Sequence, residues 1–126
     1  PPLSWSQPPK GAAELLLICD DPDAPAGTWT HWVVYGLSPD TSELPEGLPK
    51  TETVDTPRLM QGRNSFGDIG YGGPAPPKGP PHRYQFTLYA VNQPLGLKPG
   101  LEKDAVLKAA EGKILGQATL EGVYSR

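Results

Sequence analysis

The segment HRYQFTLYAV, residues 82–91, decides the fold class. Its residues alternate in polarity, and the members of one parity are mostly aromatic or apolar: His82, Tyr84, Phe86, Leu88 and Ala90. A period of two is typical of a β-strand that has one face on the core. We therefore expect a strand in which His82 and Tyr84 lie side by side at its start, while Arg83 points away from them.

Further strands are expected on both sides of this segment. ELLLICD (14–20) and HWVVYGL (31–37) are short apolar runs, which is typical of strands buried on both faces. LSW (3–5) predicts a short strand, and QATLEGVYS (117–125) predicts the last one. Residues 38–81 are expected to be mostly loop, which is longer than ordinary connections and is therefore a candidate for function.

One helix is expected, over LEKDAVLKAAEGKIL, residues 101–115. Its apolar residues recur at helical spacing, Asp104 and Lys108 form an i,i+4 pair, and Gly116 follows as a stop signal. Gly112 would lie inside this helix, where glycine costs about 1 kcal/mol relative to alanine.

Composition narrows the class of protein. The 126 residues fit one domain. Glycine and proline make up 15 and 17 of them, and they cluster between apolar runs, as in a β protein with stiff loops. A formal net charge of -3 argues against nucleic acid as a partner. The one cysteine, Cys19, is expected to be an inert core thiol, and no apolar run approaches a membrane span.

The expected location is the cytoplasm. PPLSWSQPPK, residues 1–10, lacks the charged start and apolar stretch of a signal peptide, and one cysteine calls for no oxidising compartment. A processed N-terminus would also be compatible with a periplasmic or secreted protein.

Two loops that are stiffened by proline stand out. DDPDAPAGTWTH (20–31) leaves the first buried strand, and GDIGYGGPAPPKGPPHRY (67–84) enters the strand that begins at His82. Proline fixes φ and glycine opens unusual φ values, so the second loop is shaped in advance and costs little entropy to hold around a ligand. Clustered prolines at such a site also predict a cis-proline in DPDAP or in PAPPKG.

Two spaced motifs carry a family resemblance. DPDAP followed by THWVVYGL, and then QGRNSFGDIGYGGPAPPKGPPHRYQF, resemble the phosphatidylethanolamine-binding protein family, which includes the Raf kinase inhibitor proteins. The sequence is most similar to the small bacterial and archaeal branch. The resemblance spans residues 3–91 and weakens through the expected helix.

The resemblance implies a mainly β fold with two packed, mostly antiparallel sheets and one or two peripheral helices. Family members usually have strand residues and a longer loop ahead of LSW. The resemblance therefore predicts a single domain over residues 1–126 that can lack an N-terminal edge strand, and it leaves open a monomer or a homodimer.

The resemblance also implies a small pocket for phosphate-like anions or phosphorylated head groups, as in phospholipid and lipid binding. The residues that match the family's ligand-binding positions are Asp21, Asp23, Pro25, His31, Gly72, Gly73, Pro74, Ala75, Pro76, His82 and Tyr84. Tyr84 offers a hydroxyl donor, and Asp21 is expected to accept a hydrogen bond from His31 and to favour its charged form. Asp23 is equally an ordinary turn former beside Pro22.

Three classes of function stay open at this point. A module that binds an anion, and that could modulate partner proteins, fits the donors best. A protease or kinase inhibitor that acts through protein contacts is the alternative, although no residue selects such a partner. A hydrolase that uses Asp and His is the third, but Ser65 has no nucleophile-elbow context, so no catalytic residue is expected.

No cofactor is expected either. A metal site from Asp21, Asp23, His31 and His82 would use acceptable ligand types, but the sequence lacks local ligand spacing such as H-x-x-x-H.

Overall fold

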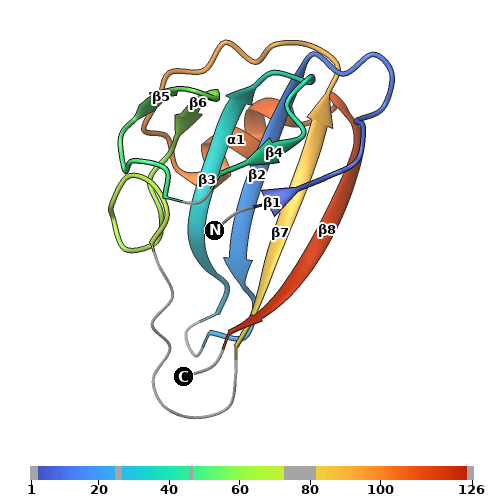
Figure 1. Ribbon diagram of the computed structural model, residues 1–126. Coiled ribbons are helices and arrows are strands. Elements are labelled where there is room, and N and C mark those ends of the chain that lie inside the picture. The colour runs from blue at the N-terminus through green and yellow to red at the C-terminus, as the bar shows by residue number, and fades with distance from the viewer. Residues whose placement is uncertain (1–2, 25–26, 46, 73–81, 125–126) are drawn as a thin grey trace.

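A six-stranded antiparallel sheet forms the centre of the molecule (Figure 1). The computed structural model describes residues 3–24, 27–45, 47–72 and 82–124, and it describes no side chains for residues 82–83 and 120–124. The strand order in the sheet is β5-β6-β3-β2-β7-β8. In chain order these strands are β2 (Glu14–Asp21), β3 (Trp29–Leu37), β5 (Thr53–Asp55), β6 (Arg58–Gln61), β7 (His82–Val91) and β8 (Ile114–Tyr124).

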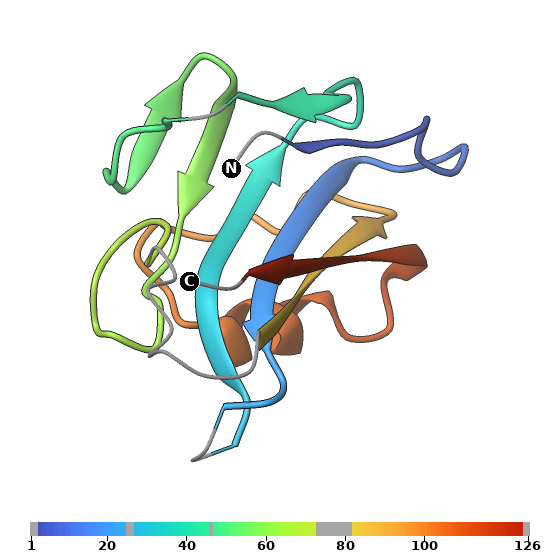
Figure 2. The same ribbon diagram turned by 60° about the horizontal axis from the view of Figure 1, so that its bottom comes forward.

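Different elements cover the two faces of this sheet. A two-stranded antiparallel sheet of β1 (Leu3–Ser4) and β4 (Glu43–Leu44) lies over one face, and the helix α1 (Lys103–Ala110) packs on the other (Figures 1 and 2). The expectation of a mainly β fold with two antiparallel sheets and a peripheral helix is confirmed. In the described ranges of the chain, no helix has the length and apolarity that crossing a membrane requires.

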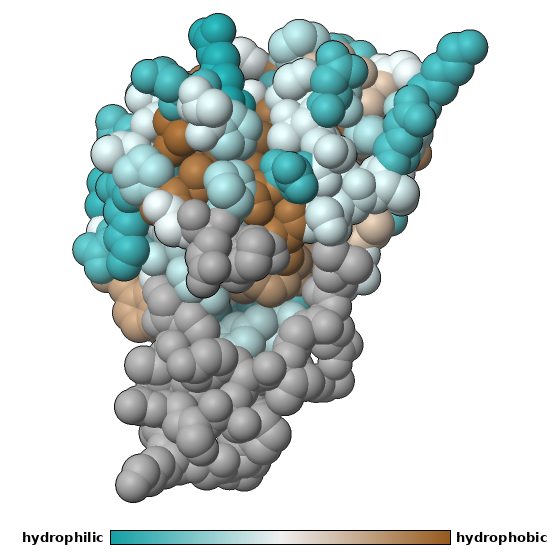
Figure 3. Space-filling view, in the orientation of Figure 1, coloured by the Kyte–Doolittle hydropathy of each residue, from teal (hydrophilic) through white to brown (hydrophobic). Residues whose placement is uncertain are grey.

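Strands β2 and β3 are buried on both faces, as their apolar runs predict. Leu15, Leu17 and Cys19 belong to the core beneath the small sheet, whereas Leu16 and Ile18 belong to the core beneath α1. On the face that carries the small sheet, apolar residues gather in the middle and hydrophilic residues surround them (Figure 3).

The helix is shorter than expected. It ends at Ala110, and the chain then turns through Gly112, whose φ of 78° lies in the left-handed region. Ile114 and Leu115, which were expected in the helix, begin β8. Gly112 rather than Gly116 is therefore the stop signal, because only glycine enters that region without a steric cost.

The expectation of a loop over residues 38–81 is partly wrong, because β4, β5 and β6 lie within it. Strand β6 pairs with β3, and its last residue, Gln61, is 1% exposed. The Gln61 side chain accepts a hydrogen bond from Trp32 Nε1 at 2.7 Å and donates to the carbonyls of Pro49 and Thr51, each at 2.8 Å. This side chain therefore binds the segment before β5 to the main sheet.

The cis-proline expectation fails where the structure can test it. Among the described residues the cis bond is Thr56–Pro57, outside both loops, and Asp21–Pro22 is trans. The Ala24–Pro25 bond and the prolines of PAPPKG lie outside the described residues.

Candidate functional site

A β-bulge in β3 decides where His31 points. Cys19 pairs with Trp32, while the next residue, Asp20, pairs with Thr30, so His31 is an extra residue on β3. Such a bulge interrupts the alternation of side chains between the faces. His31 and Trp32 consequently both lie on the face of the small sheet, where the ring of each packs near Tyr71.

Two contacts hold the His31 ring. Its Nδ1 lies 2.8 Å from the carbonyl oxygen of Gly72, and the Gly72 amide donates to the His31 carbonyl at 2.8 Å. A carbonyl oxygen only accepts, so Nδ1 carries a proton. Nε2 then accepts in the neutral ring and donates only in the imidazolium. No described residue makes a hydrogen bond to Nε2.

Tyr84 lies directly beside His31. The two ring centroids are 5.1 Å apart with an interplanar angle of 77°, which is an edge-to-face arrangement. Tyr84 is 5% exposed and belongs to the same core as Cys19 and Phe86. The expected convergence of His31 and Tyr84 on one face is therefore present in the structure.

Asp21 lies at the end of β2 and is 3% exposed. Continuing the register that pairs Asp20 with Gln85 sets Asp21 across from Tyr84. Its Oδ1 accepts a hydrogen bond from the amide of Asp23 at 2.9 Å, which forms the turn that leaves the strand. The described partner of the His31 ring is Gly72 and not Asp21, so the expected bond from His31 to Asp21 is replaced by one to a carbonyl.

A further aromatic side chain, that of Phe66, borders His31. The Phe66 ring lies 5.8 Å from the His31 ring and 5.3 Å from Trp29, and it is 53% exposed. The Trp29 indole Nε1 is buried and has no hydrogen-bond partner among the described residues. A large exposed apolar side chain thus stands next to a buried N–H donor at the edge of the site.

The segment 62–72 forms the wall opposite β7. It follows β6, and its residues bond to the bulge in β3: Ser65 N donates to Thr30 O, and Thr30 N donates to Ser65 Oγ, each at 2.8 Å. These bonds satisfy backbone groups of β3 beyond Val34, the last residue of this end of β3 that pairs with β6.

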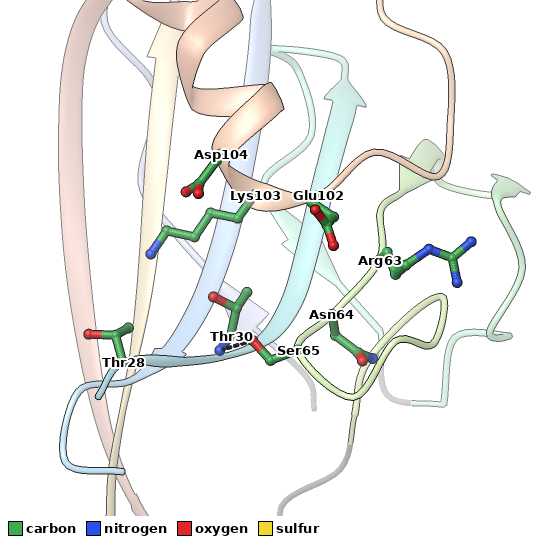
Figure 4. A pocket seen from close by; sticks show the side chains of 8 residues that line it. All are labelled: Thr28, Thr30, Arg63, Asn64, Ser65, Glu102, Lys103 and Asp104. Carbon is green, nitrogen blue, oxygen red and sulfur yellow. Dashed lines mark hydrogen bonds between the residues drawn. The ribbon is translucent and has the colours of Figure 1, made fainter. Parts of the chain in front are cut away.

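Behind the bulge, on the face of α1, a polar cluster joins the helix to the sheet. Asp20 accepts hydrogen bonds from Thr30 Oγ1 and Lys103 Nζ, both at 2.8 Å. A cavity of about 350 Å³ opens beside this cluster (Figure 4). It is lined by Thr28, Thr30, Arg63, Asn64, Ser65, Glu102, Lys103 and Asp104. Its two cations and two carboxylates give it no net charge, and nothing in the sequence predicted it.

The core beneath the site raises the pKa of the Cys19 thiol. Burial, with a smaller contribution from the charge of Asp20, raises the pKa of Cys19 from 9.0 to about 12. The Cys19 thiol therefore stays protonated near neutral pH, as expected of an inert core residue.

The structure describes part of the predicted site. Asp21, His31, Gly72 and Tyr84 come together as above, whereas the Asp23 side chain is exposed. The backbone of His82 pairs with Tyr124, but its side chain lies outside the described residues, as do Pro25, Gly73, Pro74, Ala75 and Pro76 in full. In the described segments no three His, Cys, Asp or Glu side chains are grouped to hold a metal ion.

The sequence analysis did not predict a role for Asn64, Phe66 and Tyr71, which lie on the segment 62–72 together with Gly72. Asn64 could have been found, because an asparagine shortly before a glycine is typical of a side chain that bonds the backbone of its own turn. Nothing in the sequence pattern signals that Phe66 lies near His31.

Comparisons with known proteins agree on one family. A family model described as phosphatidylethanolamine-binding protein matches residues 1–125. A UPF0098 protein of Methanothermobacter thermautotrophicus is 50% identical over all of this chain and 82% of its own length, and one of Pyrococcus horikoshii is 46% identical, with 64% of its length covered. A crystal structure from Chlamydia trachomatis, described as a putative phosphatidylethanolamine-binding protein homolog, matches with a TM-score of 0.89 and 41% identity, over the whole of this chain and 80% of that one.

Proposed function

The chain belongs to the phosphatidylethanolamine-binding protein family, and from that premise we propose that it is a binding module for phosphate-like anions. Inorganic phosphate and phosphorylated head groups share the chemistry that the site would recognise. The observation that carries the proposal is the bulge, which turns His31 onto the face of Tyr84 while Gly72 holds its Nδ1.

The donors around His31 support an anion rather than a cation as the ligand. With Nδ1 bonded to Gly72, the charged ring directs its second N–H, on Nε2, to the ligand. A hydrogen bond from a charged donor contributes about 1.5–3 kcal/mol. In this proposal the Tyr84 hydroxyl is a second ligand donor, while Asp21 shapes the turn instead of contacting the anion.

We place the protein among binding proteins and not among hydrolases. The Oγ of Ser65, the serine considered as a nucleophile, accepts a hydrogen bond from Thr30 N. That bond supports a role in anchoring the loop. Incubation with phosphate monoesters should accordingly release no inorganic phosphate above the rate without protein.

Titration calorimetry with inorganic phosphate at pH 6 tests the proposal. We expect His31→Ala to weaken binding about 10-fold to 100-fold, which corresponds to the loss of one charged donor. Lys103→Met is the matched control, because it removes a positive charge from the opposite face of the sheet. Circular dichroism checks that both variants fold.

Two results would contradict the assignment. One is unchanged affinity in His31→Ala. The other is a loss of binding in Lys103→Met alone, which would show that the anion binds in the cavity beside α1.

A further inference from the structure

We propose that Asn64 is a positioning residue for this anion site, and that it acts through Gly72 on the proton of His31. The inference rests on the proposed function of the His31 site. Asn64 is 3% exposed. The proposed function does not require it to contact the ligand.

The Asn64 side chain organises its own loop through three hydrogen bonds. Its Nδ2 donates to Gly70 O at 2.9 Å, and its Oδ1 accepts from the amides of Phe66 at 2.9 Å and Asp68 at 3.2 Å. The Asn64 backbone adds an N–H bond to Asp68 O at 2.8 Å and accepts from Gly67 N at 3.0 Å. One buried amide thus determines the path of the chain from Asn64 to Gly70.

This loop is attached to the bulge at both of its ends. Ser65 bonds Thr30 twice, through its amide and its Oγ, and Gly72 bonds His31 twice, through its amide and its carbonyl. The adjacent β3 residues Thr30 and His31 are therefore each anchored to the segment 62–72. Any change in the path from Asn64 to Gly70 moves the Gly72 carbonyl relative to His31 Nδ1.

The Asn64 side chain also lies close to Gly72. A Cβ atom added to Gly72 would lie 3.1 Å from Asn64 Nδ2 and 2.6 Å from the Phe66 ring. Gly72 is therefore packed closely against the amide and the ring, and these two side chains set the position of its carbonyl.

The chemistry of the side chain explains why an asparagine is required. Asp has the same shape, but it offers an oxygen where Nδ2 donates, and that oxygen would face the carbonyl of Gly70. Two acceptors at hydrogen-bond distance repel, and burying the charge of a carboxylate carries a further cost. We expect Asn64→Asp to displace Gly70 and with it the Gly72 carbonyl.

Loss of the hydrogen bond to the Gly72 carbonyl would change which nitrogen of the neutral His31 ring carries the proton. A general loss of stability would not have this effect. With Gly72 in place, the neutral ring keeps its proton on Nδ1. Without it, the neutral ring can place its proton on Nε2 and donate to an anion. Binding in Asn64→Asp should then be weaker at low pH and less dependent on pH than in the wild-type protein.

The test is long-range ¹H–¹⁵N NMR of the histidine rings at pH 8.5, combined with calorimetry of inorganic phosphate binding between pH 5.5 and 8. A spectrum of His31→Ala assigns the His31 signals. Asn92→Asp is the matched control, because it makes the same substitution at an exposed residue. We expect the His31 proton on Nδ1 in the wild-type protein and in Asn92→Asp, and on Nε2 in a large fraction of Asn64→Asp.

If Asn64→Asp keeps the proton on Nδ1 and the wild-type pH profile, Asn64 does not position His31 and the inference is wrong. If the proton moves to Nε2 but the wild-type protein binds no phosphate, the positioning is supported and the proposed function fails.

Ser65→Ala keeps the inference testable if Asn64→Asp does not fold. It removes only the Oγ that accepts from Thr30 N. The same shift toward Nε2, smaller in extent, would support the inference, and a wild-type tautomer would contradict it.

Discussion

The Nδ1 of His31 lies 2.8 Å from the carbonyl oxygen of Gly72, and this contact joins the bulge of β3 to the segment that follows β6. It makes Nε2 the atom that can meet a ligand. The protonation state of the ring then determines whether that atom donates or accepts. Most of the predictions on binding depend on this relationship.

Anion binding should weaken as pH rises. Sulfate is the suitable probe, because its charge is constant from pH 5 to 8, the range in which histidine side chains normally change charge. The charged ring donates from Nε2 to sulfate, whereas the neutral ring with its proton on Nδ1 only accepts there, so loss of the charge should lower the affinity about 10-fold or more. Calorimetry at five pH values checks this, and a flat profile would show that neutral groups bind the anion.

Tyr84→Phe should weaken binding, because it removes the second proposed donor and leaves the ring. The matched control is Tyr89→Phe on the same strand, since Tyr89 packs in the core on the α1 side. A neutral hydrogen bond contributes about 1 kcal/mol, so we expect a loss of about fivefold in Tyr84→Phe and none in Tyr89→Phe. Equal affinities in the two variants would remove Tyr84 from the site.

Cys19 should resist thiol reagents in the folded protein. Its pKa of about 12 leaves almost no thiolate at pH 8, and the side chain is fully buried. Reaction with a disulfide reagent should become rapid only in denaturant. Because the folded pKa lies above the unfolded value of 9.0, this group destabilises the fold as pH rises from 9 toward 12. Rapid native labelling at pH 8 would contradict this description of the core.

Gln61→Leu should destabilise the protein by about 2–4 kcal/mol. The change leaves Trp32 Nε1 and the carbonyls of Pro49 and Thr51 without their partner, and a buried unsatisfied group costs about 1–3 kcal/mol. Gln117→Leu, at an exposed position on β8, is the control. Urea unfolding measures both variants, and a Gln61 variant as stable as its control would show that this network contributes little.

Gly112→Ala distinguishes the observed end of the helix from the expected one. If Gly112 lay inside a helix, alanine would stabilise the protein by about 1 kcal/mol. In the structure its φ is 78°, and no atom of the described residues lies within 4 Å of an added Cβ, so the cost is that of the left-handed conformation alone, about 1–2 kcal/mol. Thermal unfolding gives the sign, and a raised Tm would contradict the structure.

The sequence predicted the sheet better than the site. The apolar runs of β2 and β3 and the alternation in β7 identified three central strands, because burial on one or both faces determines those patterns. Alternation alone would place His31 on the face opposite Trp32. Only the pairing of Cys19 with Trp32 and of Asp20 with Thr30 shows the bulge, and no local pattern encodes it.

The shorter strands were not predicted, for a different reason. Strands of two to four residues, such as β4 and β6, carry too few positions for a period to appear. The expected helix extended past Gly112 because Ile114 continues the helical spacing of apolar residues by chance. Tertiary pairing with Val91 places that residue in β8 instead.

The most direct test is a crystal structure of the chain with phosphoethanolamine. The proposed function predicts density for the phosphate within hydrogen-bond distance of His31 Nε2 and the Tyr84 hydroxyl, with His31 Nδ1 still bonded to Gly72. Phosphate density in the cavity between Lys103 and Arg63, with none beside His31, would contradict it.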